Sequence, residues 1–325
     1  MMKLKARYLD KKKNLSSIED VSSPHSISEA ESLQAKEMMA AEIEFLGLIN
    51  VLSVKDIEGA YGSITPNKKL ASRIDVTQRA RVPTQITITG SPYKCVRTHY
   101  DSSIGYDVID RWAHTCSKEE FEEKIDRAIW GQVGSDMLTI GWNGVKAADN
   151  TDIEAHPDLQ DVNIGWLQKL RDTAPDRVLK SASVSAGQSF LDNAVKQALN
   201  LLDSSQRKCK KLRVIFDSSA LFELITSQAK TTNEKIIAEL YLARVTNTGK
   251  ICGIPILEAP GFPAGKLLVT SPDNLSIYIQ NVRRFITDKP QDNIIYHYLT
   301  QAESYVIEDS SRCGFIEEVV IEDSE

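Results

Sequence analysis

Hydrophobic positions along the chain follow a helical spacing in some stretches and an alternating one in others. Between Phe121 and Ile140, apolar residues recur about every four positions, which is the spacing of one buried helix face. Ser117 and Glu120 precede this run as a capping box, so we predict a long helix over Ser117–Gly141. At about 1.5 Å per residue, such a helix would be roughly 35 Å long.

Two other stretches have helical spacing. Within residues 33–46, a stripe is formed by Met38, Met39, Ile43 and Leu46, and Gly47 is predicted to end that helix. It is expected to pack on the protein's own body, because it has too few basic residues to bind a membrane surface. The second follows a turn at 143–144, where Asn and Gly both tolerate positive φ. It is predicted to open at Pro157 and end at Pro175, with Leu159, Val162, Trp166, Leu167 and Leu170 on one face.

Residues 59–106 are poor in large apolar side chains and rich in Gly, Pro, Ser and Thr. They contain one alternating strand at Gln85–Thr89. Such a region cannot form a core of its own, so it indicates a long hairpin that reaches away from the body and seeks a neighbour. A flexible surface hairpin explains the same pattern.

From Gly187 the chain alternates between helical and extended patterns, which indicates a compact α/β unit. Ser189 is a predicted helix cap, and the helix that follows carries Phe190, Ala194, Val195, Ala198 and Leu202. Residues 294–321 alternate and predict long antiparallel strands turning near 309–311. The remaining predicted elements are strands at Leu48–Val54, Leu212–Asp217, Ile254–Glu258 and Lys266–Thr270, and helices at 218–228 and 233–242.

Composition fits a globular protein of 325 residues, with 42% hydrophobic and 26% charged residues. The formal net charge of -6 gives no general affinity for nucleic-acid phosphates. Five scattered cysteines without a CxxC pair argue against a disulfide framework and favour a reducing compartment. No apolar run is long enough for a membrane span, and the basic start lacks a signal-peptide core, so we expect a protein that is neither secreted nor embedded.

The candidate chemistry is weak. Cys95, His99, His114 and Cys116 are residue types that bind zinc, but their spacing lacks the paired knuckles of a structural site. Serines and histidines occur without a GxSxG elbow, and no glycine-rich phosphate loop is present. The four tryptophans (Trp112, Trp130, Trp142 and Trp166) are expected in a core or an interface. We therefore predict no catalytic, cofactor-binding or metal site, no cofactor, and a protein that is not an enzyme.

Several sequence blocks resemble one family, the major capsid proteins of the Peduovirus group of tailed phages. The most specific block is Asn143–Val178, with the pattern NGVK, LQD, GWLQK and AP.RV, and it holds no plausible reactive centre. Of the four candidate zinc ligands, only Cys95 falls where the family also has cysteine. The resemblance begins near Leu33 and continues in Phe45–Val54, Tyr93–Cys95, Asp273–Tyr278, Arg283–Leu299 and Tyr305–Ile321.

The resemblance implies an α+β fold, the tailed-phage major capsid fold of the Hong Kong ninety-seven type. That fold has an N-terminal arm, an extended hairpin loop, a peripheral domain built on a spine helix and an α/β axial domain. Carried over to this chain, the parts are expected at 1–50 (with about 1–25 removed on maturation), 51–110, 111–187 and 188–290, while 291–325 returns to the peripheral domain as C-terminal strands.

The implied function is that of a major capsid protein, which assembles into pentamers and hexamers and then into an icosahedral phage head enclosing double-stranded DNA. Expected partners are other copies of the chain, a scaffolding protein or maturation protease, and the portal. The DNA would be enclosed without sequence-specific binding, and no membrane would be involved. We expect assembly in the host cytoplasm and a final location in the virion. Two alternatives stay open: another phage structural protein of the same fold, and a cytosolic α/β enzyme using residues 187–270.

Overall fold

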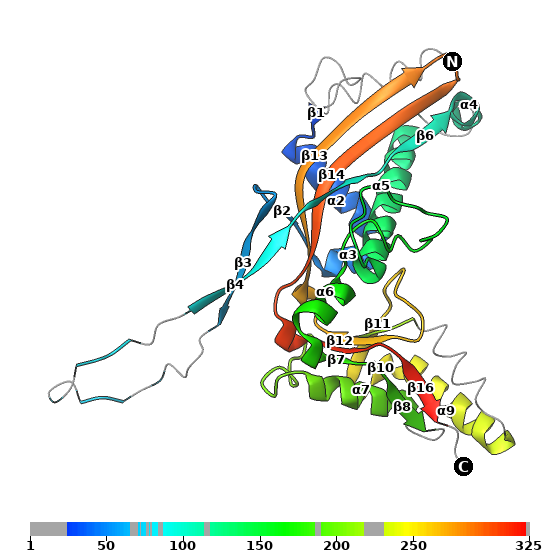
Figure 1. Cartoon of the computed structure of the whole chain (residues 1–325). Coiled ribbons are helices and arrows are strands. Elements are labelled where there is room, and N and C mark those ends of the chain that lie inside the picture. Colours follow the sequence, from blue (N-terminus) through cyan, green and yellow to red (C-terminus); the bar gives the residue numbers. More distant parts are fainter. Residues whose placement is uncertain are drawn as a thin grey trace.

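The protein is built around two sheets, which a computed structural model describes over residues 25–65, 71, 73–75, 78, 80–83, 87–113, 118–185, 190–217 and 231–322. The first sheet is dominated by two long antiparallel strands, β13 (Leu275–Lys289) and β14 (Ile294–Ile307). They run up one side of the molecule in Figure 1. Four short strands complete this sheet: β1 (His25–Ser26), β2 (Asn50–Ser53), β5 (Val96–His99) and β6 (Ser102–Gly105).

The alternating pattern of β14 separates a buried face from a more open one. Leu299, Gln301 and Glu303 are buried, whereas Thr300 and Ala302 between them are half-buried. The alternation was correctly assigned to a long strand, but its predicted partner was wrong. β14 pairs with β13, and after a 3-10 turn (η3, Ser310–Arg312) the chain enters the second sheet instead of folding back.

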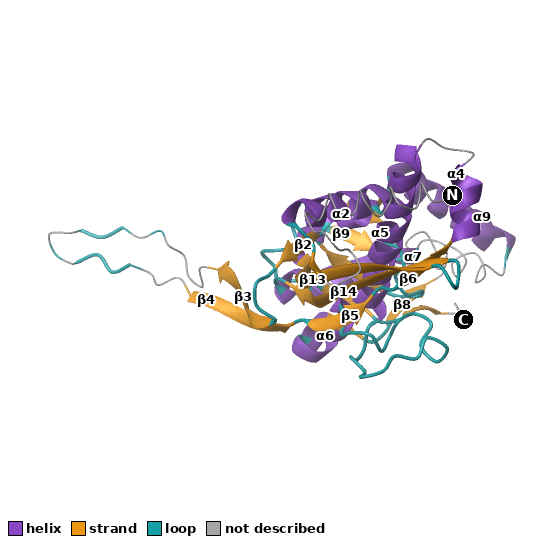
Figure 2. Cartoon of the chain, turned by 90° about the horizontal axis from the view of Figure 1, so that it is seen from above, coloured by secondary structure: helices purple, strands orange, loops and turns teal. Residues whose placement is uncertain are grey.

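Helices cover the buried face of the first sheet. α5 (Lys118–Asn143) is the longest of those described, and α2 (Glu29–Glu42) packs alongside it (Figure 2). The predicted long helix is confirmed, while its proposed cap, Ser117, lies outside the described residues. Two short helices, α4 (Tyr106–Ala113) and α6 (Trp166–Thr173), flank α5 in the chain.

The N-terminal helix begins earlier and ends differently than predicted. Ser28 caps α2 in a complete capping box with Glu31. The helix is interrupted at Ile43 and continues as α3 (Glu44–Leu48), so Gly47 lies inside a helix and does not end one. The predicted apolar stripe is confirmed, because Met39 and Leu46 are buried in the main core and Met38 and Ile43 pack against it.

The second sheet forms the other end of the molecule and has the order β10-β11-β9-β12-β15-β7. Its strands confirm those predicted near 212–217, 254–258 and 266–270. The strands are β7 (Val178–Leu179), β9 (Arg213–Ile215), β10 (Lys250–Ile251), β11 (Ile254–Leu257), β12 (Leu267–Thr270) and β15 (Gly314–Ile316). A further parallel pair, β8 (Ala182–Ser185) and β16 (Val319–Glu322), lies beside it in Figure 1.

Two helices complete this end of the molecule. α7 (Phe190–Leu201) buries Leu191, Ala194, Val195 and Ala198, as its spacing predicted. α9 (Thr232–Thr248) is longer than predicted. The predicted cap Ser189 and the predicted helix at 218–228 lie outside the described residues.

The segment between α5 and α6 departs most from its prediction. No helix starts at Pro157: residues 144–165 form an ordered loop of turns, in which Leu159 has a φ of 57°. α6 begins only at Trp166, and Pro175 starts a short 3-10 turn (η1, Pro175–Arg177) after that helix has ended. The apolar residues of the loop mimic helical spacing, but Leu159 and Val162 reach the core from turns.

Close backbone contact explains the glycines at the end of α5. A Cβ on Gly144 would lie 2.2 Å from the Asn163 carbonyl oxygen, and a Cβ on Gly165 would lie 2.4 Å from the carbonyl oxygens of Ile140 and Gly141. The Asn143–Gly144 turn was predicted correctly, but neither residue has a positive φ. Glycine is needed here for close approach and not for its conformational freedom.

Gly165→Ala should lower the free energy of unfolding by about 3 kcal/mol or more, since its Cβ would collide with backbone atoms that cannot rotate away. Chemical denaturation of the unassembled subunit measures this effect. Gly47→Ala is the matched control. Gly47 lies inside α3, and a Cβ there would be 3.7 Å from the Cβ of Ala40 in α2, which is an ordinary contact. The substitution should therefore be neutral or stabilise the fold by about 0.5–1 kcal/mol. Equal stability of the two variants would contradict the close-contact explanation.

An aromatic cluster joins the end of α5 to both sheets. Trp142 lies 4.8 Å from Trp166 and 5.1 Å from Phe262, and Trp166 meets Tyr305 edge-on at 5.3 Å. The Trp166 indole nitrogen donates to the Ser276 carbonyl at 3.0 Å. Trp130, Trp142 and Trp166 are buried as expected, while the side chain of Trp112 is not among those described.

Candidate assembly surfaces

A two-stranded hairpin projects from the first sheet. It consists of β3 (Glu58–Thr65) and β4 (Thr87–Lys94), paired in continuous register from Glu58 opposite Lys94 to Thr65 opposite Thr87. Figure 2 shows it reaching far beyond the body. The hairpin is shorter than predicted, because β5 and β6, which follow it, pair with β14 and belong to the first sheet.

The base of the hairpin is anchored to the body. The Tyr93 ring packs edge-on against Tyr278 at 5.1 Å, and the Cys95 backbone nitrogen donates to the Ile57 carbonyl at 2.7 Å. An isolated two-stranded ribbon is marginally stable in water. The outer part of the hairpin therefore gains most from packing against another molecule.

A buried carboxylate lies on the inner face of the first sheet. Glu303 is fully buried and accepts hydrogen bonds from the hydroxyls of Tyr100 at 3.0 Å and Tyr305 at 2.9 Å. The side chains of Gln301 and Thr98 also donate to it, at 2.9 and 3.4 Å. These bonds tie β5 to β14 at the level where α5 covers the sheet.

Burial dominates the titration of this cluster. It raises the pKa of Glu303 above the usual value for a glutamate, and the hydrogen bonds from Gln301, Tyr305, Tyr100 and Thr98 oppose that shift. Burial also raises the pKa values of Tyr100 and Tyr305 well above normal, and the neighbouring Glu303 adds to both shifts. The tyrosines thus remain donors at every ordinary pH. We interpret the cluster as a structural clamp.

Lys169 on α6 is a second perturbed group near this sheet. Its ammonium group donates to the Ser304 hydroxyl at 3.0 Å. Burial lowers the pKa of Lys169 to about 8, and nearby Cys95 partly opposes the shift. The Cys95 thiol has a pKa raised by burial to about 11, so it stays protonated and unreactive at neutral pH.

Between about pH 8 and pH 10 the unfolded chain holds a proton on Lys169 that the folded protein has released, so the native state should gain stability as the pH rises. We expect this gain to be on the order of 1 kcal/mol, because the half-buried side chain is partly screened by water. Lys169→Met should remove the gain, and Lys180→Met, an exposed control, should retain it. Denaturation at several pH values tests this, and identical slopes for wild type and Lys169→Met would contradict it.

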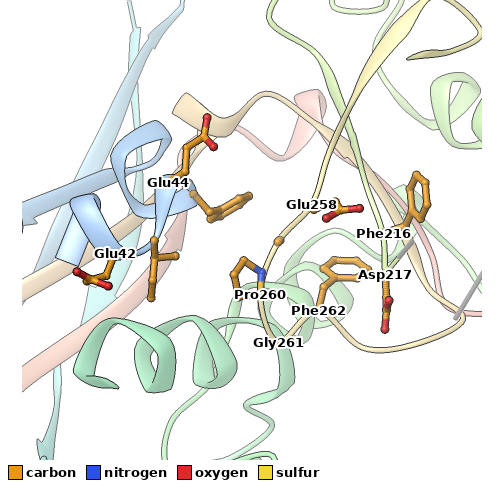
Figure 3. Close-up of a pocket in the computed structure, with 11 residues that line it drawn as sticks. Glu42, Glu44, Phe216, Asp217, Glu258, Pro260, Gly261 and Phe262 are labelled. Carbon is orange, nitrogen blue, oxygen red and sulfur yellow. The ribbon is translucent and has the colours of Figure 1, made fainter. Parts of the chain in front are cut away.

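A pocket of about 400 Å³ lies between the α2–α3 junction, the end of β9 and the loop after β11. Glu42, Glu44, Asp217 and Glu258 line it together with Phe45 and Phe262 (Figure 3). The labelled carboxylates point in different directions in this view. The described residues that line the pocket include no histidine, serine or cysteine. A Ser–His or Cys–His pair for nucleophilic catalysis is therefore not found among them.

The four candidate zinc ligands do not form a described site. Cys95 is buried with its thiol 3.9 Å from the Tyr278 carbonyl oxygen, whereas the exposed His99 is hydrogen-bonded to Thr300 at 2.9 Å. His114 and Cys116 lie outside the described residues. Within the described ranges, no group of three metal-binding side chains occurs, and no helix could cross a bilayer.

Comparison with known proteins decides the family. The model of a family described as "Phage major capsid protein, P2 family" matches residues 6–319 of the chain. The chain belongs to the P2 family of phage major capsid proteins. It is 27% identical over 340 residues to the capsid proteins of Escherichia phage P2, covering 97% of this chain and 93% of that one. It is 30% identical over 308 residues to the major capsid protein of Serratia phage KSP20, covering 87% and 86%.

Solved structures agree with this assignment. A satellite phage P4 procapsid that includes the size determination (Sid) protein contains a chain that is 27% identical and matches with a TM-score of 0.72, over 89% of this chain and 99% of that one. The capsid of an empty GTA particle matches at 11% identity with a TM-score of 0.52, over 86% and 90%, which supports the fold alone.

The chain is therefore the major capsid protein of a phage head, with the α+β tailed-phage capsid fold. It assembles with copies of itself into a capsid and forms part of the virion, and it is not an enzyme. The sequence analysis missed Glu303. The signal was a glutamate on the apolar side of an alternating strand, two positions before Tyr305 and four after Leu299.

Proposed function

We propose that copies of this capsid protein form rings of five and six, in which each hairpin lies across the adjacent copy. The projecting hairpin supports this proposal. β3 and β4 form a two-stranded ribbon, and such a ribbon becomes stable only when it packs against another surface. Each copy would bury modest surface against several neighbours. Individual contacts would then stay weak and correctable, while the closed shell is stable through their number.

The two sheets would occupy different positions in each ring. The second sheet with α7 and α9 would surround the axis of each ring, while the first sheet with α5 would form the periphery. The strand pairing would move the expected limits of the axial domain, 188–290, and of the returning C-terminal strands, 291–325. β13 pairs within the peripheral sheet, and β15 and β16 pair with strands of the axial end.

The basic N-terminal segment would meet a scaffolding protein or maturation protease and then be removed. Its six basic residues lie between Lys3 and Lys13. Removal before His25 would leave the β1 pairing and the Ser28 capping box intact. The finished head would join a portal and enclose double-stranded DNA without reading its sequence, after assembly in the host cytoplasm.

Electron microscopy of the full chain, co-expressed with the phage's scaffolding protein, tests this proposal. Closed shells with rings of five and six are the expected result. A wild-type chain that stays monomeric at high concentration together with its scaffold would overturn it.

A further inference from the structure

A second pocket, of about 420 Å³, opens on the face of the first sheet opposite α5, beside the base of the hairpin. Its apolar lining includes Ile57, of which 50% is exposed, and Phe285. The register of β13 and β14 shifts between Gln280 and Arg283, and Asn281 in this bulge has a φ of 52°. The bulge bends the strand and increases its twist at this point.

The described side chains that line this pocket are basic, polar or apolar. Arg97, Arg283 and His99 line it, and no carboxylate is among the described residues of the lining. Arg97 and Arg283 are exposed, and neither has an ion-pair partner among the residues that the structure describes. The guanidinium group of an arginine without an ion-pair partner can donate two parallel hydrogen bonds to a carboxylate or a phosphate.

An aromatic row extends from the pocket along the same face. Phe285 and Tyr298 stack at 4.4 Å with their planes 14° apart, and Tyr296 stacks on Tyr298 at 6.1 Å. Lys289 lies 4.8 Å from the centre of the Tyr296 ring. Tyr298 stacks on two rings and Lys289 lies over the face of Tyr296, so these two tyrosines offer mainly their edges and hydroxyls to a partner. Ring edges carry partial positive charge, which favours a carboxylate-bearing partner.

The chain itself carries a matching acidic surface in the loop between α5 and α6. Backbone hydrogen bonds fix the shape of this loop. The Val145 nitrogen donates to the Gln160 carbonyl at 2.7 Å, and the Ala148 nitrogen donates to the Asp161 carbonyl at 2.8 Å. The Asp152 carboxylate accepts from the backbone nitrogen of Glu154 at 3.0 Å. The loop is thus ordered before it meets any partner.

The tip of this loop combines an apolar side chain with unpaired acids. Ile153 is 68% exposed, although it is a large hydrophobic residue. Asp149 and Glu154 are exposed, and the described part of the chain offers neither an ion pair. The loop and the pocket are therefore complementary in charge, and each has an apolar contact to make.

We propose that the pocket on one copy receives the acidic loop, residues 149–158, of a second copy. Ile153 would lie against Ile57 and Phe285, and Asp149 and Glu154 would pair with Arg97 and Arg283. In Figure 1 the green loop that follows α5 lies on the side of β14 away from the hairpin. The pocket lies beside the base of the hairpin, so the pocket and the loop lie on different sides of the subunit, as a head-to-tail contact within a ring requires. The inference rests on the proposed ring assembly.

Charge reversal and its compensation test the contact. Arg97→Glu with Arg283→Glu, and separately Asp149→Lys with Glu154→Lys, should each lower the yield of closed shells about tenfold or more, because like charges would face each other. The four changes together should restore the yield to within roughly threefold of wild type, because opposite charges meet again. Lys208→Glu with Lys210→Glu is the control of equal charge change and should assemble normally.

Shells would be counted by electron microscopy after co-expression with the scaffolding protein, and each purified variant would be checked by thermal unfolding. Normal assembly of both reversed pairs, or no recovery in the fourfold variant, would overturn the pairing. Normal assembly combined with reduced DNA content in the pocket variant would also overturn it, since the arginines would then serve phosphates. A wild type that forms no shells would instead refute the ring assembly itself.

Disulfide trapping covers variants that fold poorly. Arg283→Cys and Glu154→Cys in the same chain should give linked dimers and higher ladders when assembled particles are oxidised with diamide. Each single variant, which retains the natural cysteines, should not. A double variant that assembles without such links would overturn the contact.

Discussion

Shortening the hairpin should abolish closed shells while leaving the subunit folded. Replacing residues 63–89 by Asn-Gly would join Gly62 to its partner Gly90 through a two-residue turn. The contacts that anchor the hairpin, through Tyr93 and Cys95, would remain. We expect the yield of shells to fall on the order of a hundredfold, because every copy loses its reach over a neighbour and the losses multiply around the shell.

The folded state of this shortened chain is the internal control. Its unfolding temperature should stay within about 3 °C of wild type, since few contacts of the body are removed. Sedimentation and electron microscopy of the chain with its scaffold measure assembly. Normal shells from the shortened chain would show that the hairpin is not needed to join copies.

Glu303→Ala should cause a large loss of stability in the subunit itself. It would leave the buried hydroxyls of Tyr100 and Tyr305 and the amide of Gln301 without their acceptor. Each unsatisfied buried donor costs about 1–3 kcal/mol, so we expect the free energy of unfolding to fall by roughly 3–5 kcal/mol. Chemical denaturation of unassembled protein is the measurement.

Glu303→Gln is the matched control, because its amide oxygen can still accept from both tyrosines. It should cost only about 1–2 kcal/mol, mainly through the Gln301 amide, which must rotate to present its oxygen. If Glu303→Ala were within about 1 kcal/mol of wild type, water or another acceptor must satisfy the buried donors, and the clamp would be refuted.

Local patterns predicted the elements whose residues are close in sequence. The apolar spacing of α5 and α7 and the buried runs of β9 and β12 were read correctly, because one face or one short strand decides each of them. The pairing partner of β14 was not predicted correctly, since alternation shows which face of a strand is buried but not which strand lies beside it. The same reason explains why β5 was assigned to the hairpin.

The candidate surfaces also differ in whether neighbouring residues or distant strands create them. The hairpin was predicted from its lack of apolar residues, a property of composition. The Glu303 clamp and the basic pocket were missed, because Arg97 and Arg283 meet only when β5, β14 and β13 are paired. At Gly144 the turn was foreseen, but its cause, the carbonyl of Asn163, is contributed by the far end of a loop.

The glycine contacts at the end of α5 have a mechanical consequence. Since backbone there touches backbone and Trp166 is wedged between Trp142 and Tyr305, the helix and the long sheet form a stiff lever. A container built of such levers would alter its diameter by tilting whole subunits against one another. Strain from a filling interior would then fall on the seams between subunits, and not on their cores.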